Sequence, residues 1–197
     1  MKVLFITSNR NKVVEANKTL SSLGFEVEQF LVGGLPPKFT EPQTSSIAEV
    51  SESKINQALE LISGTEFNDH AILVEDSGLF IESLNDFPGV YSSYVSKTIG
   101  NKGIIDLLDD KSNRNAEYRA YTILHKKGVF FHALGVCSGL ISTEIRGPNG
   151  FGYDPIFIPD FGEGRTFGEM EEYEKTEKSH RAKSLKILYD QLNRPSK

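Results

Sequence analysis

The chain has 197 residues, 38% of them hydrophobic and 25% charged, which suffices for a folded core. Its net charge of −5 argues against a nucleic-acid polymer as partner. The single cysteine, Cys137, excludes an intrachain disulfide, and no apolar run approaches the ~20 residues that a membrane helix needs. Because residues 1–6 read as the start of a strand and not as a signal peptide, we expect a cytoplasmic protein without a membrane partner.

The first part of the sequence predicts a β-α-β opening. Residues 3–6 form a continuous apolar run, which is typical of a strand buried on both faces. Apolar residues then recur at helical spacing over residues 13–23, and Gly24 marks the end of that helix. Residues 25–32 predict a second strand. This order of elements favours an α/β fold with a mixed or parallel sheet.

The rest of the chain predicts further short strands and helices. Ser46 and Glu49 form a capping-box pattern that opens a helix to about residue 63. The hairpin at Lys127–Gly128 is the clearest antiparallel element. Residues 169–178 are dense in charge and are expected to be exposed. The other expected elements are strands 71–75, 79–84 (as a hairpin continuation of 71–75), 116–125 and 129–142, and helices 91–99, 101–109 and 180–192.

The polar loop Thr7–Lys12 joins the first strand to the first helix. Backbone N–H groups at a helix N-terminus bind phosphate well, and Lys12 adds a positive charge. The alternative is an ordinary polar loop with Asn11 as the helix cap. The loop is no Walker A motif, because its glycine pattern is absent.

Lys54 falls on the apolar side of the helix that opens at Ser46. It shares a stripe with Ile47, Val50 and Ala58 at helical spacing. A lysine there either extends its ammonium group to solvent or points into a cleft.

Two acidic residues, Glu75 and Asp76, end the buried strand that begins at residue 71. Glu75 and Asp76 are adjacent in a strand, so their side chains are expected to point to opposite sides. Carboxylates near phosphate usually hold Mg²⁺, and one of them can instead deprotonate an attacking water. A turn cap formed by Asp76 is the alternative, and Glu41 is a second candidate metal ligand.

Aromatic and polar residues near the C-terminus are candidates for recognition of a planar ligand. Phe151 lies in a glycine-rich loop, where a ring can stack on a base; Asp154 can accept a hydrogen bond from a base N–H. Ser179, His180 and Arg181 open the last helix, and Arg181 is in register with that helix's packed side.

Five motifs occur in order along almost the whole chain: Thr7–Lys12, Val74–Gly78, Phe87–Ser92, Gly150–Pro155 and Ser179–Arg181. Together they resemble the inosine triphosphate pyrophosphatase family, also called the Ham1-like or non-canonical purine NTP pyrophosphatases. The resemblance implies a mixed, twisted sheet with flanking helices and two lobes around a central cleft, within one domain over residues 1–197. It also implies a homodimer.

The resemblance implies Mg²⁺-dependent hydrolysis of ITP, dITP and XTP to the monophosphate and pyrophosphate, which removes deaminated purines from the nucleotide pool. Asp76 is the implied catalytic residue, and Glu41 and Asp76 are the implied metal ligands. Whether Glu75 shares metal binding is open. The residues expected to bind the purine nucleoside triphosphate are Thr7, Asn9, Lys12, Lys54, Ser77, Phe151, Gly152, Tyr153, Asp154, Lys175, Ser179, His180 and Arg181.

The sequence departs from the family pattern at two positions. It is also compatible with two other functions. Tyr153 stands where many members have Trp, and Ser93 where some have Lys. One alternative is a Maf-like hydrolase that acts on other bases; Ser179-His180-Arg181 favours purines instead. The other is a nucleotide-binding sensor without turnover, against which Asp76 argues, because a pure binder of a polyanion gains little from a carboxylate beside phosphate.

Overall fold

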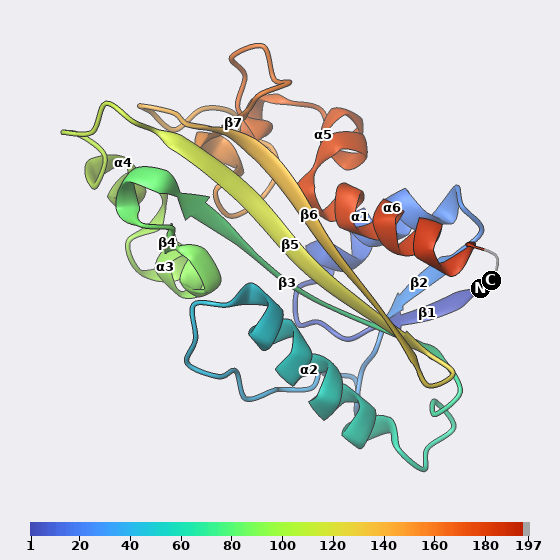
Figure 1. The fold of residues 1–197 in the computed structure, drawn as a ribbon. Coiled ribbons are helices and arrows are strands. Elements are labelled where there is room, and N and C mark those ends of the chain that lie inside the picture. Colours follow the sequence, from blue (N-terminus) through green and yellow to red (C-terminus); the bar gives the residue numbers. More distant parts are fainter. Residues whose placement is uncertain (195–197) are drawn as a thin grey trace. The chain divides into compact units, whose positions relative to one another are not determined.

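A computed structural model describes residues 1–194, drawn as a ribbon in Figure 1, and the chain divides into two compact units. Unit 1 comprises Met1–Asp76, Ala120–Gly135 and the chain from Arg181 onward; unit 2 comprises Ser77–Arg119 and Val136–His180. The strands are β1 (Lys2–Phe5), β2 (Glu26–Gln29), β3 (Ala71–Ile81), β4 (Phe87–Pro88), β5 (Asn115–Lys126), β6 (Val129–Ile141) and β7 (Phe157–Pro159). Of these, β3, β5 and β6 each contribute residues to both units. The organisation as one domain with two lobes around a cleft stays a prediction.

Unit 1 contains the predicted β-α-β opening. Strand β1 pairs in parallel with both β2 and β3, and the strand order is β2-β1-β3-β5-β6. Lys127 and Gly128 both have positive φ in the turn between β5 and β6, the conformation that a two-residue hairpin requires. The elements of unit 1 are β1 (Lys2–Phe5), α1 (Arg10–Ser21), β2 (Glu26–Gln29), α2 (Ile47–Ile62), α6 (His180–Leu192, from Arg181) and parts of β3 (Ala71–Ile81), β5 (Asn115–Lys126) and β6 (Val129–Ile141).

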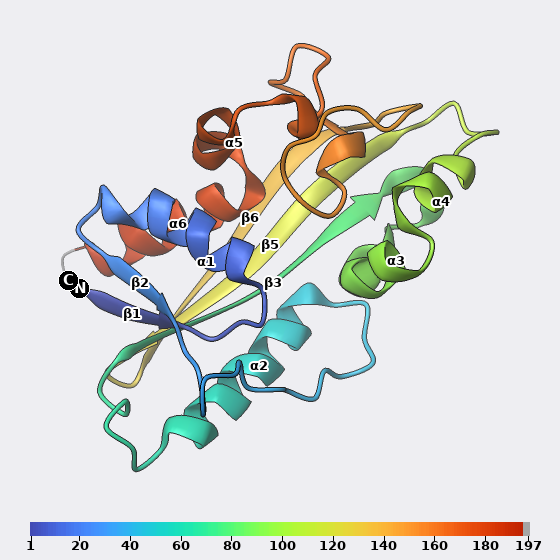
Figure 2. The ribbon, with the colours of Figure 1, turned by 180° about the vertical axis from the view of Figure 1, so that it is seen from behind.

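The alternation of side chains along β1 builds two cores in unit 1. Val3 and Phe5 face one core, which includes residues from α1 and α6. Leu4 and Ile6 face the other, which includes residues from α2. Figures 1 and 2 show α1 and α6 side by side, away from α2. The central strands of unit 1 are therefore covered on both faces, as their continuous apolar runs predict.

Unit 2 has its own core, formed where parts of β3, β5 and β6 meet short helices. Strand β4 pairs antiparallel with β3, and β7 pairs antiparallel with β6. Since β1 pairs in parallel with its neighbours, the sheet is mixed and the predicted α/β fold class is confirmed. The remaining elements are β4 (Phe87–Pro88), α3 (Ser92–Thr98), α4 (Gly100–Asp106), β7 (Phe157–Pro159), α5 (Glu172–Lys178) and short 3-10 helices over Glu82–Leu84, Gly89–Tyr91, Asp154–Ile156 and Phe167–Glu169.

Two predictions about elements were wrong. Residues 79–84 are no separate hairpin strand, because β3 runs without a break from Ala71 to Ile81 and every residue but Ser77 is buried. The charged stretch 169–178 is not uniformly exposed. Thr166 and Glu171 each open a short helix with a capping box, and Lys175 in the second of these helices is only 6% exposed. Local charge density alone did not reveal which lysine has a buried partner.

No helix within residues 1–194 is long and apolar enough to cross a bilayer. This finding agrees with the sequence, in which no apolar run has the required length.

Gly78 lets the backbone of β3 approach a neighbouring turn in unit 2. A Cβ at this position would lie 2.2 Å from the carbonyl oxygen of Gly89, which is backbone and has little freedom to move. We therefore expect Gly78→Ala to lower the free energy of unfolding by about 1–3 kcal/mol, as overpacking does elsewhere. Urea denaturation monitored by circular dichroism measures this change. A variant as stable as the unsubstituted chain would contradict the tight approach.

Candidate active site

Glu75 and Asp76 lie side by side in β3, and their side chains point to opposite faces. Glu75 contacts residues of α1 and α6, whereas Asp76 contacts Lys54 of α2. The strand places consecutive side chains on alternate sides, so the predicted orientation is confirmed. Each carboxylate consequently belongs to a different set of contacts within unit 1.

Arg181 of α6 is the centre of the contacts around Glu75. Its Nε donates to both oxygens of Glu75 at 2.9 and 3.1 Å, and its Nη2 donates to Oε1 at 2.8 Å. Nη1 donates to Glu15 of α1. Arg181 is 1% exposed. Burial by itself lowers the pKa of Arg181, but Glu75 and Glu15 outweigh burial and raise it. The guanidinium group therefore stays charged and joins β3, α1 and α6.

Lys12 of α1 is the second cation beside Glu75. Its Nζ lies 3.3 Å from Oε1 of Glu75, and its side chain is largely buried. Burial lowers the pKa of Lys12. Burial alone raises the pKa of Glu75, but Arg181 and Lys12 more than compensate, so the pKa of Glu75 is lowered. Both oxygens of Glu75 contact cations, so Glu75 is a poor candidate for a metal ligand.

Lys54 lies between the two carboxylates predicted to bind metal. Its Nζ is 2.6 Å from Oδ1 of Asp76 and 2.8 Å from Oε1 of Glu41. The lysine side chain is only 15% exposed, so its ammonium group points inward and does not extend to solvent. Burial lowers the pKa of Lys54, but the two carboxylates reverse this effect and raise it. A cation already bridges the pair of acids.

The set of oxygen atoms around Asp76 fits Mg²⁺. Oδ2 of Asp76 is buried and has no hydrogen-bond partner within residues 1–194. Glu41 is half exposed, so its carboxylate is accessible. Mg²⁺ is usually held by one or two carboxylates together with phosphate oxygens and waters, and this pair supplies that number. Within the same residues no cluster of three or more metal-ligating side chains occurs, so two carboxylates need substrate oxygens to complete a site.

Ser51 of α2 fixes the backbone beside these residues. Its hydroxyl accepts from the N–H of Asp76 at 3.1 Å and donates to the carbonyl of Tyr121 at 2.9 Å. Ser51 is fully buried. The helix that carries Lys54 is thus tied to the strand that carries Asp76, and Ser46 caps that helix as predicted.

The loop before α1 has the geometry of a helix N-terminus. Asn9 is the N-cap, and its side chain accepts from the N–H of Asn11 at 3.0 Å. The alternative that made Asn11 the cap was wrong, because Asn9 is the cap and the helix begins two residues earlier than that alternative requires, at Arg10. The Thr7 hydroxyl accepts from the Asn9 N–H at 3.2 Å. First-turn N–H groups, with Lys12 beside them, are a suitable place for a phosphate.

A second set of predicted residues meets in unit 2, around Asp154. Its Oδ2 accepts from Lys175 Nζ at 2.6 Å and from the Phe151 N–H at 2.8 Å. Lys175 Nζ also lies 4.6 Å from the centre of the Phe151 ring. Asp154 and Lys175 are both buried. The loop aromatic, the acid and the lysine are therefore held as one assembly.

Tyr118 connects His180 to this assembly. The two rings stack with centroids 4.6 Å apart and planes 7° apart, and the Tyr118 hydroxyl lies 3.5 Å from Oδ1 of Asp154. Ser179, the residue before His180, ends α5 in extended conformation and is buried. We refer to Tyr118, Phe151, Asp154, Lys175 and His180 as the aromatic group.

Three other residues predicted to bind substrate are Tyr153, Gly152 and Ser77, and the first two have contacts within the protein. Tyr153 is 3% exposed, and its hydroxyl donates to the carbonyl of Ser92 at 2.9 Å. Burial raises the pKa of Tyr153. The Gly152 carbonyl accepts from Asn101 at 3.1 Å, and Ser77 is the one half-buried residue of β3. Substrate binding by these three residues stays a prediction.

The sequence did not single out Glu15, Ser51 or Tyr118. Glu15 follows Lys12 by three residues, so helical spacing places the two on one face, and this was an available signal. Ser51 and Tyr118 gave none, because a serine in a helix and a tyrosine in a strand are ordinary at those positions.

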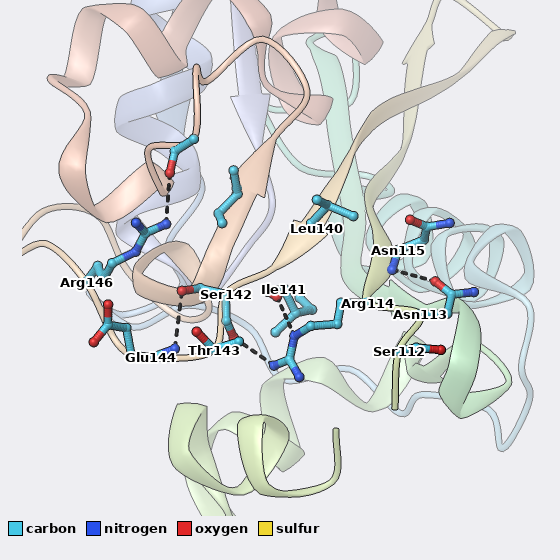
Figure 3. Close-up of a pocket in the computed structure, with 12 residues that line it drawn as sticks. Ser112, Asn113, Arg114, Asn115, Leu140, Ile141, Ser142, Thr143, Glu144 and Arg146 are labelled. Atoms are coloured by element: carbon cyan, nitrogen blue, oxygen red, sulfur yellow. Dashed lines mark hydrogen bonds between the residues drawn. The ribbon is translucent and has the colours of Figure 1, made fainter. Parts of the chain in front are cut away.

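A pocket of about 440 Å³ in unit 2 is lined by none of the predicted site residues, and Figure 3 draws its lining side chains. Arg114, one of the two arginines that line it, donates to the backbone carbonyls of Leu108, Ile141 and Ser142. These bonds hold the segment that precedes β5 against the end of β6. Arg114 therefore serves the backbone and not a ligand.

The fold and these residues define an α/β protein with a site suited to a phosphorylated ligand and a divalent cation. The chain matches the Ham1 family over residues 3–191 and belongs to it. It is 42% identical over 192 residues to a dITP/XTP pyrophosphatase of Pyrococcus horikoshii, which covers 98% of this chain and 97% of the relative. It is 43% identical to one of Thermococcus kodakarensis, covering 94% of each chain. The solved structure of a HAM1 protein from Coxiella burnetii has a TM-score of 0.81 at 27% identity and covers 99% of this chain and 100% of that one.

The two neighbouring carboxylates are expected to differ in their effect on stability. Glu75→Gln leaves Arg181 and Lys12 buried with an uncharged partner, so we expect a loss of about 3–5 kcal/mol in the free energy of unfolding. Asp76→Asn keeps the volume and leaves Lys54 paired with Glu41, so we expect a change below about 1 kcal/mol. Urea denaturation at neutral pH measures both.

The same experiment repeated at lower pH tests the cause. Because the pKa of Glu75 is lowered in the folded chain, its stabilising effect is complete above the ordinary carboxyl pKa and is lost as the pH falls through the folded value. The difference between the unsubstituted chain and Glu75→Gln should therefore shrink in acid. A difference that is independent of pH would contradict an ionic role.

Proposed function

We propose that this protein hydrolyses non-canonical purine nucleoside triphosphates, namely ITP, dITP and XTP, to the monophosphate and pyrophosphate. The observation that carries the proposal is the arrangement in unit 1, where Lys54 bridges Asp76 and Glu41 while Lys12 lies beside a capped helix N-terminus. Lys12 and Lys54 are the cations that would face the phosphates, and Asp76 and Glu41 are the carboxylates that would hold a divalent ion. The relatives named dITP/XTP pyrophosphatase support the substrate class.

Asp76 and Glu41 are the residues that would hold Mg²⁺. When bound, the ion neutralises charge on the phosphates and on the leaving pyrophosphate. Lys12 and Lys54 bind phosphate oxygens in this proposal, and the positive end of the α1 dipole beside Asn9 adds to the attraction. Asp76 would either ligate the ion through Oδ2, which is buried without a protein partner in residues 1–194, or use that oxygen to accept the proton of the attacking water.

Three members of the aromatic group, Phe151, Lys175 and His180, are proposed to recognise the base. Phe151 offers a ring for stacking, and His180 and Lys175 offer donors to the 6-oxo group of hypoxanthine or xanthine. Adenine presents an amino donor at that position, so ATP leaves donors unpaired and is bound poorly.

The sequence resemblance predicted that Arg181 would contact the base. In this proposal Arg181 positions other residues instead. Its guanidinium group is bound to Glu75 and Glu15. We propose that Arg181 orients Glu75, which in turn orients Lys12.

Two further attributes belong to the proposal. We propose that the chain works in the cytoplasm, where nucleotide pools are used, and that it forms a homodimer. Sedimentation velocity of the purified chain measures the second attribute directly, and a single species at the mass of one chain would contradict it.

A screen of nucleoside triphosphates tests the activity. With Mg²⁺ present, ITP, dITP and XTP are expected to release pyrophosphate with kcat/KM at least about 10³-fold above that of ATP, because a mismatched polar site discriminates strongly. GTP shares the 6-oxo group and is expected to be intermediate. Excess EDTA should abolish turnover, since the carboxylate pair then lacks its cation. Pyrophosphate release that is equal for all nucleotides, or equal turnover in EDTA, would overturn the proposal.

Lys54 is expected to act on substrate. Lys54→Ala removes one charge-assisted contact to phosphate, so kcat/KM for ITP should fall about 10- to 100-fold. The variant also leaves the buried Asp76 without its cation and is expected to be less stable, so kinetics are compared well below its melting temperature. Lys102→Ala is the control, because Lys102 is an exposed lysine of α4 that pairs only with Asp106 within residues 1–194. Kinetics within about twofold of the unsubstituted enzyme for Lys54→Ala would show that Lys54 serves only Asp76 and Glu41.

A further inference from the structure

The orientation of the His180 ring determines where its N–H groups point. The torsion that rotates an imidazole about its Cβ–Cγ bond has a broad preference, so the backbone and rotamer leave the plane of the ring poorly fixed. An imidazole hydrogen-bonds in its own plane. Something other than the rotamer must hold that plane if His180 is to distinguish one base edge from another.

Tyr118 supplies that constraint. Its ring lies parallel to the His180 ring within 7°, at a centroid distance of 4.6 Å. Tyr118 is itself buried and packed edge-on against Phe157, with centroids 4.8 Å apart. A flat, immobile ring on one face of His180 excludes rotation about Cβ–Cγ, because rotation would drive the imidazole edge into the phenol.

Tyr118 also links His180 to the other residues of the aromatic group. Its hydroxyl lies 3.5 Å from Asp154 Oδ1, while Asp154 Oδ2 accepts from Lys175 and from the Phe151 N–H. The 3.5 Å contact is long for a hydrogen bond between oxygens, so the stacked ring is the stronger constraint. These contacts fix the positions of the N–H donors of His180 and Lys175 relative to each other.

We infer that Tyr118 is a specificity-determining positioning residue, which fixes the plane of His180 against the base without contacting substrate itself. The inference rests on the proposed function, because it assigns His180 to base recognition. It predicts that removal of the Tyr118 ring weakens discrimination between 6-oxo and 6-amino purines more than it weakens turnover as such.

Three variants test this inference. Tyr118→Leu removes the stacked ring, and Tyr118→Phe keeps the ring and removes only the hydroxyl. Ile104→Ala is the control, because Ile104 is a fully buried residue of α4 in the same core of unit 2, and its truncation lowers stability without altering the stack. Melting temperatures identify any variant that fails to fold at the assay temperature.

The kinetic readout is the ratio of kcat/KM for ITP to that for ATP. Tyr118→Leu should lower this ratio by about tenfold or more, Tyr118→Phe should keep it within about twofold, and Ile104→Ala should leave it unchanged even if both rates fall. A ratio that is unchanged in Tyr118→Leu overturns the inference, and so does an equal loss in Tyr118→Phe, which would assign the effect to the hydroxyl.

A spectroscopic readout is independent of activity. A ring stacked on an imidazole shifts the His180 ring protons upfield in proton NMR, and the chain has only four histidines, so His180→Gln assigns the resonance. The shift should vanish in Tyr118→Leu and persist in Tyr118→Phe. Absence of the shift in the unsubstituted chain overturns the inference even if no nucleotide is hydrolysed. Absence of pyrophosphate release by the unsubstituted enzyme, with the shift present, instead counts against the proposed function.

Discussion

The buried contact between Arg181 and Glu75 is the constraint on which unit 1 depends. Removing charged groups from water costs several kcal/mol each, so such a contact persists only where geometry is good and every charge has partners. Arg181 meets this condition with two hydrogen-bonded carboxylates, Glu75 and Glu15, which come from a strand and from another helix. Arg181 thereby holds together β3, α1 and α6, which are far apart in sequence. Lys12 of α1 lies beside the same Glu75 carboxylate.

The alternation of side chains along β3 then separates support from chemistry. Glu75 faces α1 and α6, where cations saturate it, and Asp76 faces α2, where one of its oxygens has no partner within residues 1–194. Two acids of nearly the same chemistry thus acquire different properties from a single residue step. The catalytic role is therefore proposed for Asp76 and not for Glu75, because both oxygens of Glu75 already contact cations.

Unit 2 uses a different means of fixing its polar groups. The aromatic group holds Lys175 and His180 with ring faces and one buried carboxylate, Asp154. Rings are rigid and lose little conformational entropy when packed, so they orient hydrogen-bond donors at small cost. Under the proposed function, the ion pairs of unit 1 position groups that bind a polyanion, whereas the stacked rings of unit 2 position donors that contact the edge of a neutral base.

The sequence by itself determined the α/β class, the β-α-β opening, the capped helix at Ser46 and the opposite orientation of Glu75 and Asp76, because hydrophobic period, capping residues and strand alternation are local properties. The resemblance of five ordered motifs determined the family, which the match over residues 3–191 confirmed. Only the tertiary structure decided which charges pair. The contact of Arg181 with Glu75 joins residues 106 positions apart, and the stack of Tyr118 on His180 also joins different elements. Neither contact has a local signature, since pairing between distant residues depends on how the elements pack and on the need of each buried charge or ring for a partner.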